Sequence, residues 1–267
     1  MATQGNWSEK PVVIVTGASR GIGLAVVTIL LEELDARIVG IVRSTNSSLD
    51  HLLEKHTDSL VLIYGDVTEP ETSKRAVASA LERFGSLDSL ILNAAVFTPH
   101  GTVSSIPVDS IEHPQDTWRH VFDVNVFSLI HTIKTSLPHL KSSRRGGRIV
   151  FVSSGSSLKG WHGVGPYSAS KAAVNSLART LAKEEENLVV VAVQPGVVDT
   201  DMQGQVRRSS GMTPDDVQTF RDMHSEGKLV QPSDTGYVIS SLALAANKEL
   251  SGQYLNWDGE ECQPYKR

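Results

Sequence analysis

The chain has 267 residues, of which 40% are hydrophobic and 21% charged, a composition typical of folded globular proteins that excludes a disordered or fibrous chain. Its 25 basic and 30 acidic residues give a net charge of −5, which argues against nucleic acid or an anionic membrane as a partner. The single cysteine, Cys262, excludes an internal disulfide. Because Met1–Lys10 lacks a signal-peptide pattern and no apolar run is long enough to cross a bilayer, the sequence predicts a cytoplasmic protein.

Short, nearly continuous apolar runs alternate with longer amphipathic stretches along the chain. The runs predict strands at Val12–Thr16, Arg37–Val42, Ser59–Tyr64, Leu87–Asn93, Gly147–Ser153 and Leu188–Gln194, with an edge strand at Gln253–Trp257. The stretches predict helices at Gly21–Leu34, Ser48–Lys55, Glu69–Phe84, Gln115–Lys141, Tyr167–Glu186, Pro214–Ser225 and Pro232–Ala246.

This alternation predicts an α/β fold, a single doubly wound Rossmann-type domain whose parallel sheet of about seven strands carries helices on both faces. We expect the domain to span residues 11–258, between a polar N-terminal tail (1–10) and a C-terminal tail (259–267). Three irregular stretches, Val96–Pro114, Ser154–Pro166 and Gly196–Thr213, each follow a predicted strand. They should therefore gather at the carboxyl edge of the sheet, where ligands bind in such folds.

A glycine-rich turn joins the first predicted strand to the first helix. It contains Gly17, Ser19, Arg20, Gly21, Ile22 and Gly23. Glycine allows a tight turn and a close approach to a ligand, and the helix start offers free N–H groups and a positive dipole end to a pyrophosphate. Taken alone, the motif also fits an ordinary glycine-rich turn between strand and helix.

Later in the chain, three residues form a candidate catalytic group. Tyr167 and Lys171 are four residues apart, on one face of a predicted helix. A nearby ammonium stabilises a phenolate, so Tyr167 can exchange a proton with a carbonyl oxygen. Ser154, at the end of the fifth strand, can hydrogen-bond the same oxygen. Each feature alone also fits a structural role, a packed ring beside a solvated lysine or a serine in a turn.

Together these motifs resemble the short-chain dehydrogenase/reductase family, from about Pro11 to Trp257. The resemblance implies that Asn125 is a structural and proton-relay residue, and that Tyr167 and Lys171 also contact the cofactor. It implies further cofactor contacts at Asp66 and Val67 near the adenine, at Asn93, Ala94 and Ala95 (an N-A-G turn with alanine in place of its glycine), and at Pro195, Gly196, Val198 and Thr200 near the nicotinamide.

The end of the second strand indicates which dinucleotide binds. An acidic residue that holds an unphosphorylated ribose is expected about 20 residues beyond the glycine turn, where this chain has Arg43. The nearest acidic residues, Asp35 and Asp50, lie before and after the strand. Because Arg43, with Arg20, suits a 2′-phosphate, the sequence predicts NADP as the cofactor.

The substrate is less clearly indicated. An apolar pocket is expected from Phe97, Leu158, Trp161, Met202, Val206 and Met212, unless these residues simply pack a lid on the domain. The segments Gly65–Glu69, Gly196–Gln203 and Gly252–Leu255 resemble benzil reductases, which are sepiapterin-reductase-like enzymes that reduce dicarbonyls. Asp258 lies where sepiapterin reductases carry a substrate-binding aspartate, but its surroundings differ, so that role is not carried over.

The sequence therefore predicts an NADPH-dependent carbonyl reductase acting on a small-molecule carbonyl substrate. A dinucleotide sensor without turnover and an NAD-linked alcohol dehydrogenase are the alternatives. No metal-ligand spacing is present among the histidines, so no metal is expected. The helices predicted at Gln115–Lys141 and Tyr167–Glu186 carry apolar and small residues beyond one stripe, and by resemblance they form the interface of a homo-oligomer, most simply a dimer.

Overall fold

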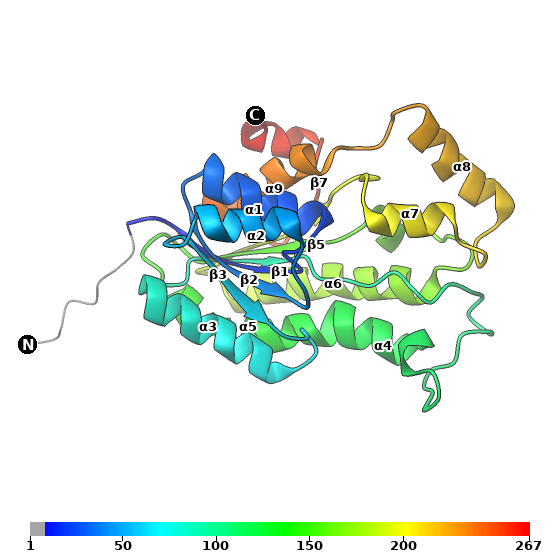
Figure 1. Cartoon of the computed structure of the whole chain (residues 1–267), viewed down its shortest axis with the longest axis horizontal. Helices are drawn as coiled ribbons and strands as arrows, with labels where there is room; N and C mark the ends of the chain where they lie inside the picture. The colour runs from blue at the N-terminus through cyan, green and yellow to red at the C-terminus, as the bar shows by residue number, and fades with distance from the viewer. Residues whose placement is uncertain (1–8) are drawn as a thin grey trace, which may run out of the picture.

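The computed structural model, which describes residues 9–267, contains one parallel seven-stranded sheet in the order β3-β2-β1-β4-β5-β6-β7 (Figure 1). The strands are β1 (Val12–Thr16), β2 (Arg37–Val42), β3 (Leu60–Tyr64), β4 (Ser89–Leu92), β5 (Arg148–Val152), β6 (Val189–Gln194) and β7 (Tyr254–Asn256). The predicted doubly wound sheet is confirmed, and the last short run is the edge strand that the sequence predicts. The N-terminal tail predicted for residues 1–10 lies, up to residue 8, outside the described residues.

Helices cover both faces of the sheet (Figure 1). On one face lie α1 (Gly21–Glu32), α2 (Ser47–Lys55) and α9 (Pro232–Ala245), and on the other α3 (Pro70–Phe84), α5 (Ser128–Lys141) and α6 (Gly165–Glu184). Successive residues of a strand point to opposite faces, so Val13 and Val15 join the first hydrophobic core while Val12 and Ile14 join the second. Burial on both faces explains the nearly continuous apolar runs.

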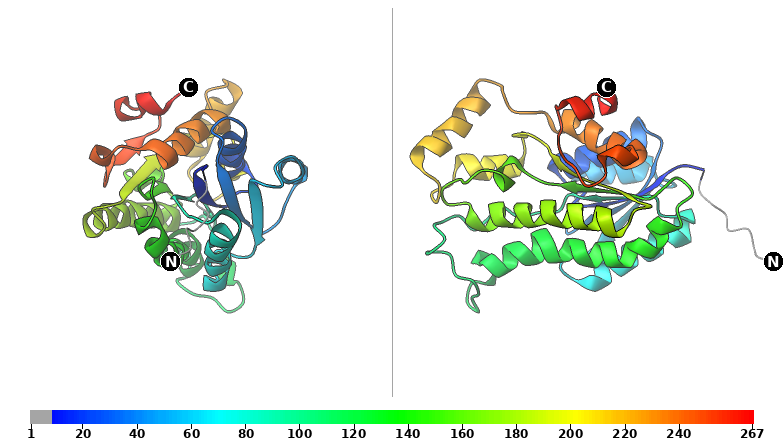
Figure 2. Two further views of the ribbon diagram at one scale, coloured as in Figure 1. Left: turned by 90° about the vertical axis from the view of Figure 1, so that its left-hand side faces the viewer. Right: turned by 180° about the vertical axis from the view of Figure 1, so that it is seen from behind.

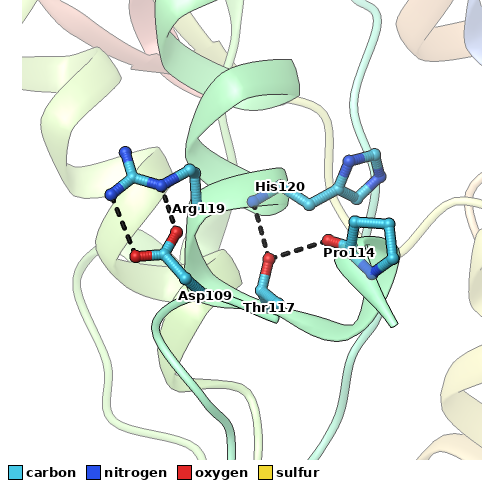
Figure 3. Close-up of polar contacts among 5 residues, drawn as sticks. All are labelled: Asp109, Pro114, Thr117, Arg119 and His120. Carbon is cyan, nitrogen blue, oxygen red and sulfur yellow. Dashed lines mark hydrogen bonds and ion pairs between the residues drawn. The ribbon is translucent and has the colours of Figure 1, made fainter. Parts of the chain in front are cut away.

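The long helix predicted at Gln115–Lys141 is interrupted, which corrects the sequence analysis. A 3₁₀ turn (Pro114–Asp116) precedes α4 (Trp118–Phe122), and a π-helical turn (Asp123–Phe127) leads into α5. The Thr117 hydroxyl caps α4 by accepting the His120 N–H at 3.1 Å, and Arg119 pairs with Asp109 of the preceding loop (Figure 3). The cap residue has extended backbone angles, so α4 begins after it.

The stretch Gly196–Thr213 was expected to be irregular, but it contains α7 (Asp201–Arg207). The Thr200 hydroxyl caps this helix by accepting the Gln203 N–H at 3.3 Å, a short cap-and-helix signal that apolar periodicity does not show. The next helix, α8 (Pro214–Ser225), has the predicted bounds. Both lie beyond one end of the sheet, at the right of the view (Figure 1).

The C-terminal tail predicted for residues 259–267 packs onto the domain. It forms a 3₁₀ helix (Glu260–Tyr265) against β7 and α9 (Figure 2). Cys262 and Tyr265 are buried in the first hydrophobic core, and Arg267 pairs with Glu33. The packed domain therefore extends past residue 258. Within residues 9–267, no helix is both long and apolar enough to cross a membrane.

Candidate active site

The glycine-rich turn is fixed to the end of β4 by hydrogen bonds from the Asn93-Ala94 segment. The Thr16 hydroxyl oxygen accepts both the Asn93 and the Ala94 N–H at 3.0 Å. The Asn93 side-chain amide donates to the carbonyls of Thr16 and Gly17 at 3.0 and 3.1 Å. Thr16, which the sequence analysis did not select, therefore helps to hold the turn, and Ala95 follows as a partly buried residue.

The backbone of this turn requires glycine and leaves a helix end open for an anion. Gly17 and Gly21 have φ values of +69° and +54°, a region that side chains disfavour. A Cβ on Gly23 would lie 2.1 Å from the Gly17 carbonyl oxygen. At the start of α1 no side chain caps the N–H groups, and the first turn has no acidic residue. This arrangement fits the pyrophosphate of a dinucleotide, while Ile22 packs toward the core.

Arg43 and Asp66 lie together at the ends of β2 and β3. Arg43 is exposed directly after β2. Partial burial pushes the pKa of the Asp66 carboxyl upward, but hydrogen bonds from Thr68 and the charge of Arg43 outweigh burial, so the pKa is lowered. Val67 is buried beside them. This corner therefore combines a fixed carboxylate with an exposed guanidinium, while Asn46 anchors the neighbouring loop to the Ser19 carbonyl.

Arg20 has a partner that the sequence did not predict. Its guanidinium lies 3.5 Å from the Asp201 carboxylate of α7, and both side chains are exposed. The pair lines a cleft of about 780 Å³, together with Gly21 and Thr200. Arg20 thus links the glycine turn to α7.

Tyr167 and Lys171 lie buried one turn apart on α6, as their spacing predicts. The Lys171 ammonium donates to the Val152 carbonyl at 2.7 Å and lies 5.8 Å from the centre of the Tyr167 ring. Burial lowers the pKa of Lys171 to about 8. Burial also raises the pKa of Tyr167, and a hydrogen bond with Ser154 opposes this rise. Burial thus outweighs the hydrogen bond with Ser154, and Tyr167 is protonated at neutral pH.

Ser154 follows β5 and caps a 3₁₀ turn (Gly155–Ser157). Its side-chain oxygen accepts the Ser156 N–H at 3.2 Å and the Ser156 hydroxyl at 3.0 Å. Because both contacts use lone pairs, the Ser154 O–H remains the donor in its hydrogen bond with Tyr167.

Asn125 is fully buried in the π-helical turn and ties two parts of the site together. Its side-chain oxygen accepts the Val96 N–H at 2.8 Å, and its amide donates to the Val96 carbonyl at 2.9 Å and to the Ser170 hydroxyl at 3.0 Å. Both amide hydrogens are therefore used. The side chain thus joins the segment after β4 to α6, and the proton-relay role implied by resemblance stays a prediction.

The segment after β6 returns to the glycine turn. Gly196 has a φ of +82°, and a Cβ there would lie 2.8 Å from the Trp257 indole nitrogen. Val198 pairs with Val230 in an isolated bridge. The Thr200 methyl group lies 3.1 Å from where a Cβ of Gly21 would be. The segment from Pro195 to Thr200 therefore closes against the glycine turn, and its contact with the nicotinamide stays a prediction from the resemblance.

An apolar cluster surrounds the Tyr167 ring, and we call it the substrate-side cluster. Its buried members are Phe97, Val164, Tyr167, Met212 and Val217, with Trp161, Met202, Val206 and Phe220 packed against them. The Phe97 and Tyr167 ring centres are 5.0 Å apart. Five of the six predicted pocket residues thus come together, but Leu158 is 68% exposed and lies outside the cluster. Asp258 is also exposed and outside it.

His100, which the sequence analysis missed, joins the three loops at the carboxyl edge. Its ring centre is 4.5 Å from that of Phe97, and its Nδ1 lies 3.0 Å from the Ser209 hydroxyl. Burial lowers the pKa of His100, so the ring is neutral at pH 7. The Gly101 N–H donates to the Gly163 carbonyl at 2.9 Å. The predicted gathering of the three irregular stretches is therefore confirmed.

Comparison with known proteins identifies the family. The model of the short chain dehydrogenase family matches residues 11–211. The chain belongs to this family, whose members are oxidoreductases that use nicotinamide dinucleotides to interconvert CH–OH and C=O groups. Among residues 9–267, no three His, Cys, Asp or Glu side chains come together as a metal site.

Individual relatives cover almost the whole chain. An uncharacterized oxidoreductase of Schizosaccharomyces pombe is 39% identical over 253 residues, which is 94% of this chain and 97% of the relative. A benzil reductase ((S)-benzoin forming) of Saccharomyces cerevisiae is 37% identical over 260 residues, covering 95% and 98%. The crystal structure of a short-chain dehydrogenase/reductase from Saccharomyces cerevisiae matches with a TM-score of 0.89 and 35% identity, covering 96% of this chain and 100% of that one.

Proposed function

We propose that this protein is an NADPH-dependent carbonyl reductase for small ketones, aldehydes or dicarbonyls, with Tyr167 as the general acid. The observation that carries the proposal is that Tyr167 is buried in the substrate-side cluster, with the Lys171 ammonium 5.8 Å from the centre of its ring.

Tyr167, Ser154 and Lys171 each have a separate role in the proposed reduction. The bound dinucleotide supplies the hydride that reaches the carbonyl carbon. Tyr167 donates its phenolic proton to the carbonyl oxygen, and the Ser154 hydroxyl hydrogen-bonds that oxygen as negative charge develops. The Lys171 ammonium stabilises the phenolate that remains. Because burial raises the pKa of Tyr167, the side chain holds the proton that reduction needs.

The substrate-side cluster supports an apolar or aromatic carbonyl compound. Its buried members are apolar or aromatic and meet at the Tyr167 ring, and such side chains line most small-molecule sites. The benzil reductase relative acts, by its name, on an aromatic dicarbonyl. Aromatic α-diketones are therefore the substrates to test first.

The preference for NADPH rests on Arg43. Its exposed guanidinium lies close enough to Asp66 to lower the pKa of that carboxyl, and no acidic residue lies between positions 43 and 46. The nearest acidic residue that follows, Asp50, accepts a hydrogen bond from the Thr45 hydroxyl. An arginine fork suits a 2′-phosphate. Since Arg20 pairs with Asp201, Arg43 is the main candidate.

Consumption of NADPH tests the proposal. The purified protein is mixed with NADPH or NADH and a panel of diketones, monoketones and aldehydes, and the loss of reduced cofactor is followed by absorbance. We expect turnover with NADPH and an aromatic diketone, with a hydroxyketone as product. Tight NADPH binding without turnover of any carbonyl would instead favour a dinucleotide sensor.

We also propose that the protein is a homodimer and that it is located in the cytosol. α5 and α6 lie on the outer face of the molecule (Figure 2), and Phe127 at the start of α5 is 45% exposed. Exposed apolar side chains of this kind suit a two-fold interface. Cys262 is a buried free thiol, which suits a reducing compartment. Light scattering should report twice the monomer mass at micromolar concentration, and a monomeric mass would contradict the dimer.

A further inference from the structure

A second tyrosine, Tyr254, contacts the backbone carbonyl of the catalytic serine, Ser154. Tyr254 lies in β7 opposite Ala192 of β6, and its phenol reaches past β6 to the end of β5. There the single phenol proton faces two acceptors, the Ser154 carbonyl oxygen at 3.1 Å and the Gln194 side-chain oxygen at 2.5 Å, so the hydroxyl is shared between them. The short edge strand is thus connected directly to the backbone of a reacting residue.

The same carbonyl has a second donor, so the Ser154 peptide is held from several elements. The Ser157 hydroxyl donates to the Ser154 carbonyl at 2.6 Å and accepts the Asn175 amide at 2.8 Å. Asn175 lies on α6, one turn beyond Lys171, and its oxygen also accepts the Ser153 hydroxyl. The α6 helix that carries Tyr167 therefore also determines, through Asn175, where the serine lies.

These contacts act on a segment whose position needs support. Ser154 lies two residues beyond the end of β5, so the sheet no longer holds it, and the glycine that follows has no side chain to pack. Gln194 packs here as well, since a Cβ on Gly155 would lie 3.2 Å from its amide nitrogen. Small displacements of a catalytic group cost large factors in rate.

We propose that Tyr254 is a positioning residue that fixes the Ser154 hydroxyl relative to Tyr167 by hydrogen-bonding the Ser154 carbonyl. The inference rests on the proposed reductase function. Burial raises the pKa of Tyr254, so the phenol remains a donor throughout the working pH range. Its effect should fall on kcat, because Ser154 stabilises charge that develops in the transition state, and not on the binding of NADPH.

Kinetics of four proteins test the inference: wild type, Tyr254→Phe, Ser154→Ala and the double variant. Tyr254→Phe keeps the ring and loses the donor, and we expect kcat to fall by about tenfold to a hundredfold while the Kd for NADPH stays unchanged. In the Ser154→Ala background the same change should alter kcat less than about twofold, because the group that Tyr254 positions is gone.

Tyr265→Phe is the matched control. It also removes a phenol hydroxyl with one backbone contact, the Asn247 N–H at 3.1 Å, but it lies in the C-terminal 3₁₀ helix. We expect its kcat to match the wild type. If Tyr254→Phe lowers kcat equally with and without Ser154, or has no effect with Ser154 present, the positioning role is refuted.

A crystal structure of Tyr254→Phe tests the inference without turnover. We expect Ser154 to shift relative to Tyr167, or to occupy more than one position. An unmoved, well-ordered Ser154 would refute the inference. If the wild type reduces no carbonyl, the proposed function fails, and the crystal structure still decides whether Tyr254 holds Ser154.

Discussion

The two halves of the site are built in different ways. On the cofactor side, the glycine turn and the Asn93 segment are held by contacts that involve the backbone, at 3.0 to 3.1 Å. On the substrate side, three loops meet through side-chain packing around Phe97 and Met212. Backbone contacts restrict which residues fit, whereas packed side chains can be exchanged for others of similar volume. Substitutions should therefore change the substrate specificity far more easily than the binding of the cofactor.

Lys171, which lies between the two halves, should show a large effect on turnover. Lys171→Met keeps the length of the chain and removes the charge that stabilises the Tyr167 phenolate, so we expect kcat to fall by roughly a hundredfold or more. Stability should change in the opposite direction. Burial lowers the pKa of Lys171 from 10.5 to about 8, so the charge is unfavourable in the folded protein at pH 7.

Urea unfolding at pH 7 should therefore give Lys171→Met a free energy of unfolding about 1–3 kcal/mol above the wild type. The unfolded chain keeps its proton up to about pH 10.5 and the folded chain only up to about pH 8. The wild type should therefore gain stability as pH rises between these values, and the advantage of the variant should shrink. Equal stabilities at pH 7 would mean that Lys171 is not buried as a charged group.

Arg43→Asp tests the cofactor side alone. The change should weaken NADPH by repelling its phosphate and strengthen NADH by supplying an acceptor for the ribose. One hydrogen bond to a charged group is worth about 1.5–3 kcal/mol, so the ratio of kcat/KM for the two cofactors should move by roughly tenfold to a hundredfold. A wild type that prefers NADH, or a ratio that stays constant, would show that Arg43 does not contact the ribose.

Phe97→Ala tests the substrate side, and Leu158→Ala is its control. Phe97 is buried with its ring centre 5.0 Å from that of Tyr167, whereas Leu158 is exposed. An aromatic pair contributes about 0.5–1.5 kcal/mol beyond burial, so kcat/KM for an aromatic diketone should fall about threefold to tenfold with Phe97→Ala. NADPH affinity and the Leu158→Ala kinetics should stay at wild-type values. A loss of NADPH binding would show that the two halves are coupled.

The sequence predicts the features that depend on residues close in the chain and misses those that depend on distant contacts. The strands of the sheet, the glycine turn and the Tyr167–Lys171 spacing follow from local patterns, because each depends on residues close in the chain. The partners of Arg20 and Ser154, namely Asp201 and Tyr254, lie far away in sequence, and no periodicity indicates them. The α7 helix escaped detection because its seven residues are too few for an apolar period.

The exposure of Leu158 and the break at Thr117 were missed for a related reason. Both depend on how a loop runs over the domain, which is decided by packing and by capping at single residues. The C-terminal segment is similar, because the burial of Cys262 and Tyr265 depends on a surface built by α9 and β7.

The most direct test of the account is the rate of reduction by Tyr167→Phe with NADPH already bound. The variant keeps the ring in the substrate-side cluster and loses the proton donor, so NADPH should bind with the wild-type Kd. A single-turnover measurement with an aromatic diketone should then show a rate about 10²–10⁴-fold below the wild type. A variant that binds NADPH normally and reduces the diketone at close to the wild-type rate would contradict the assignment of Tyr167 as the general acid.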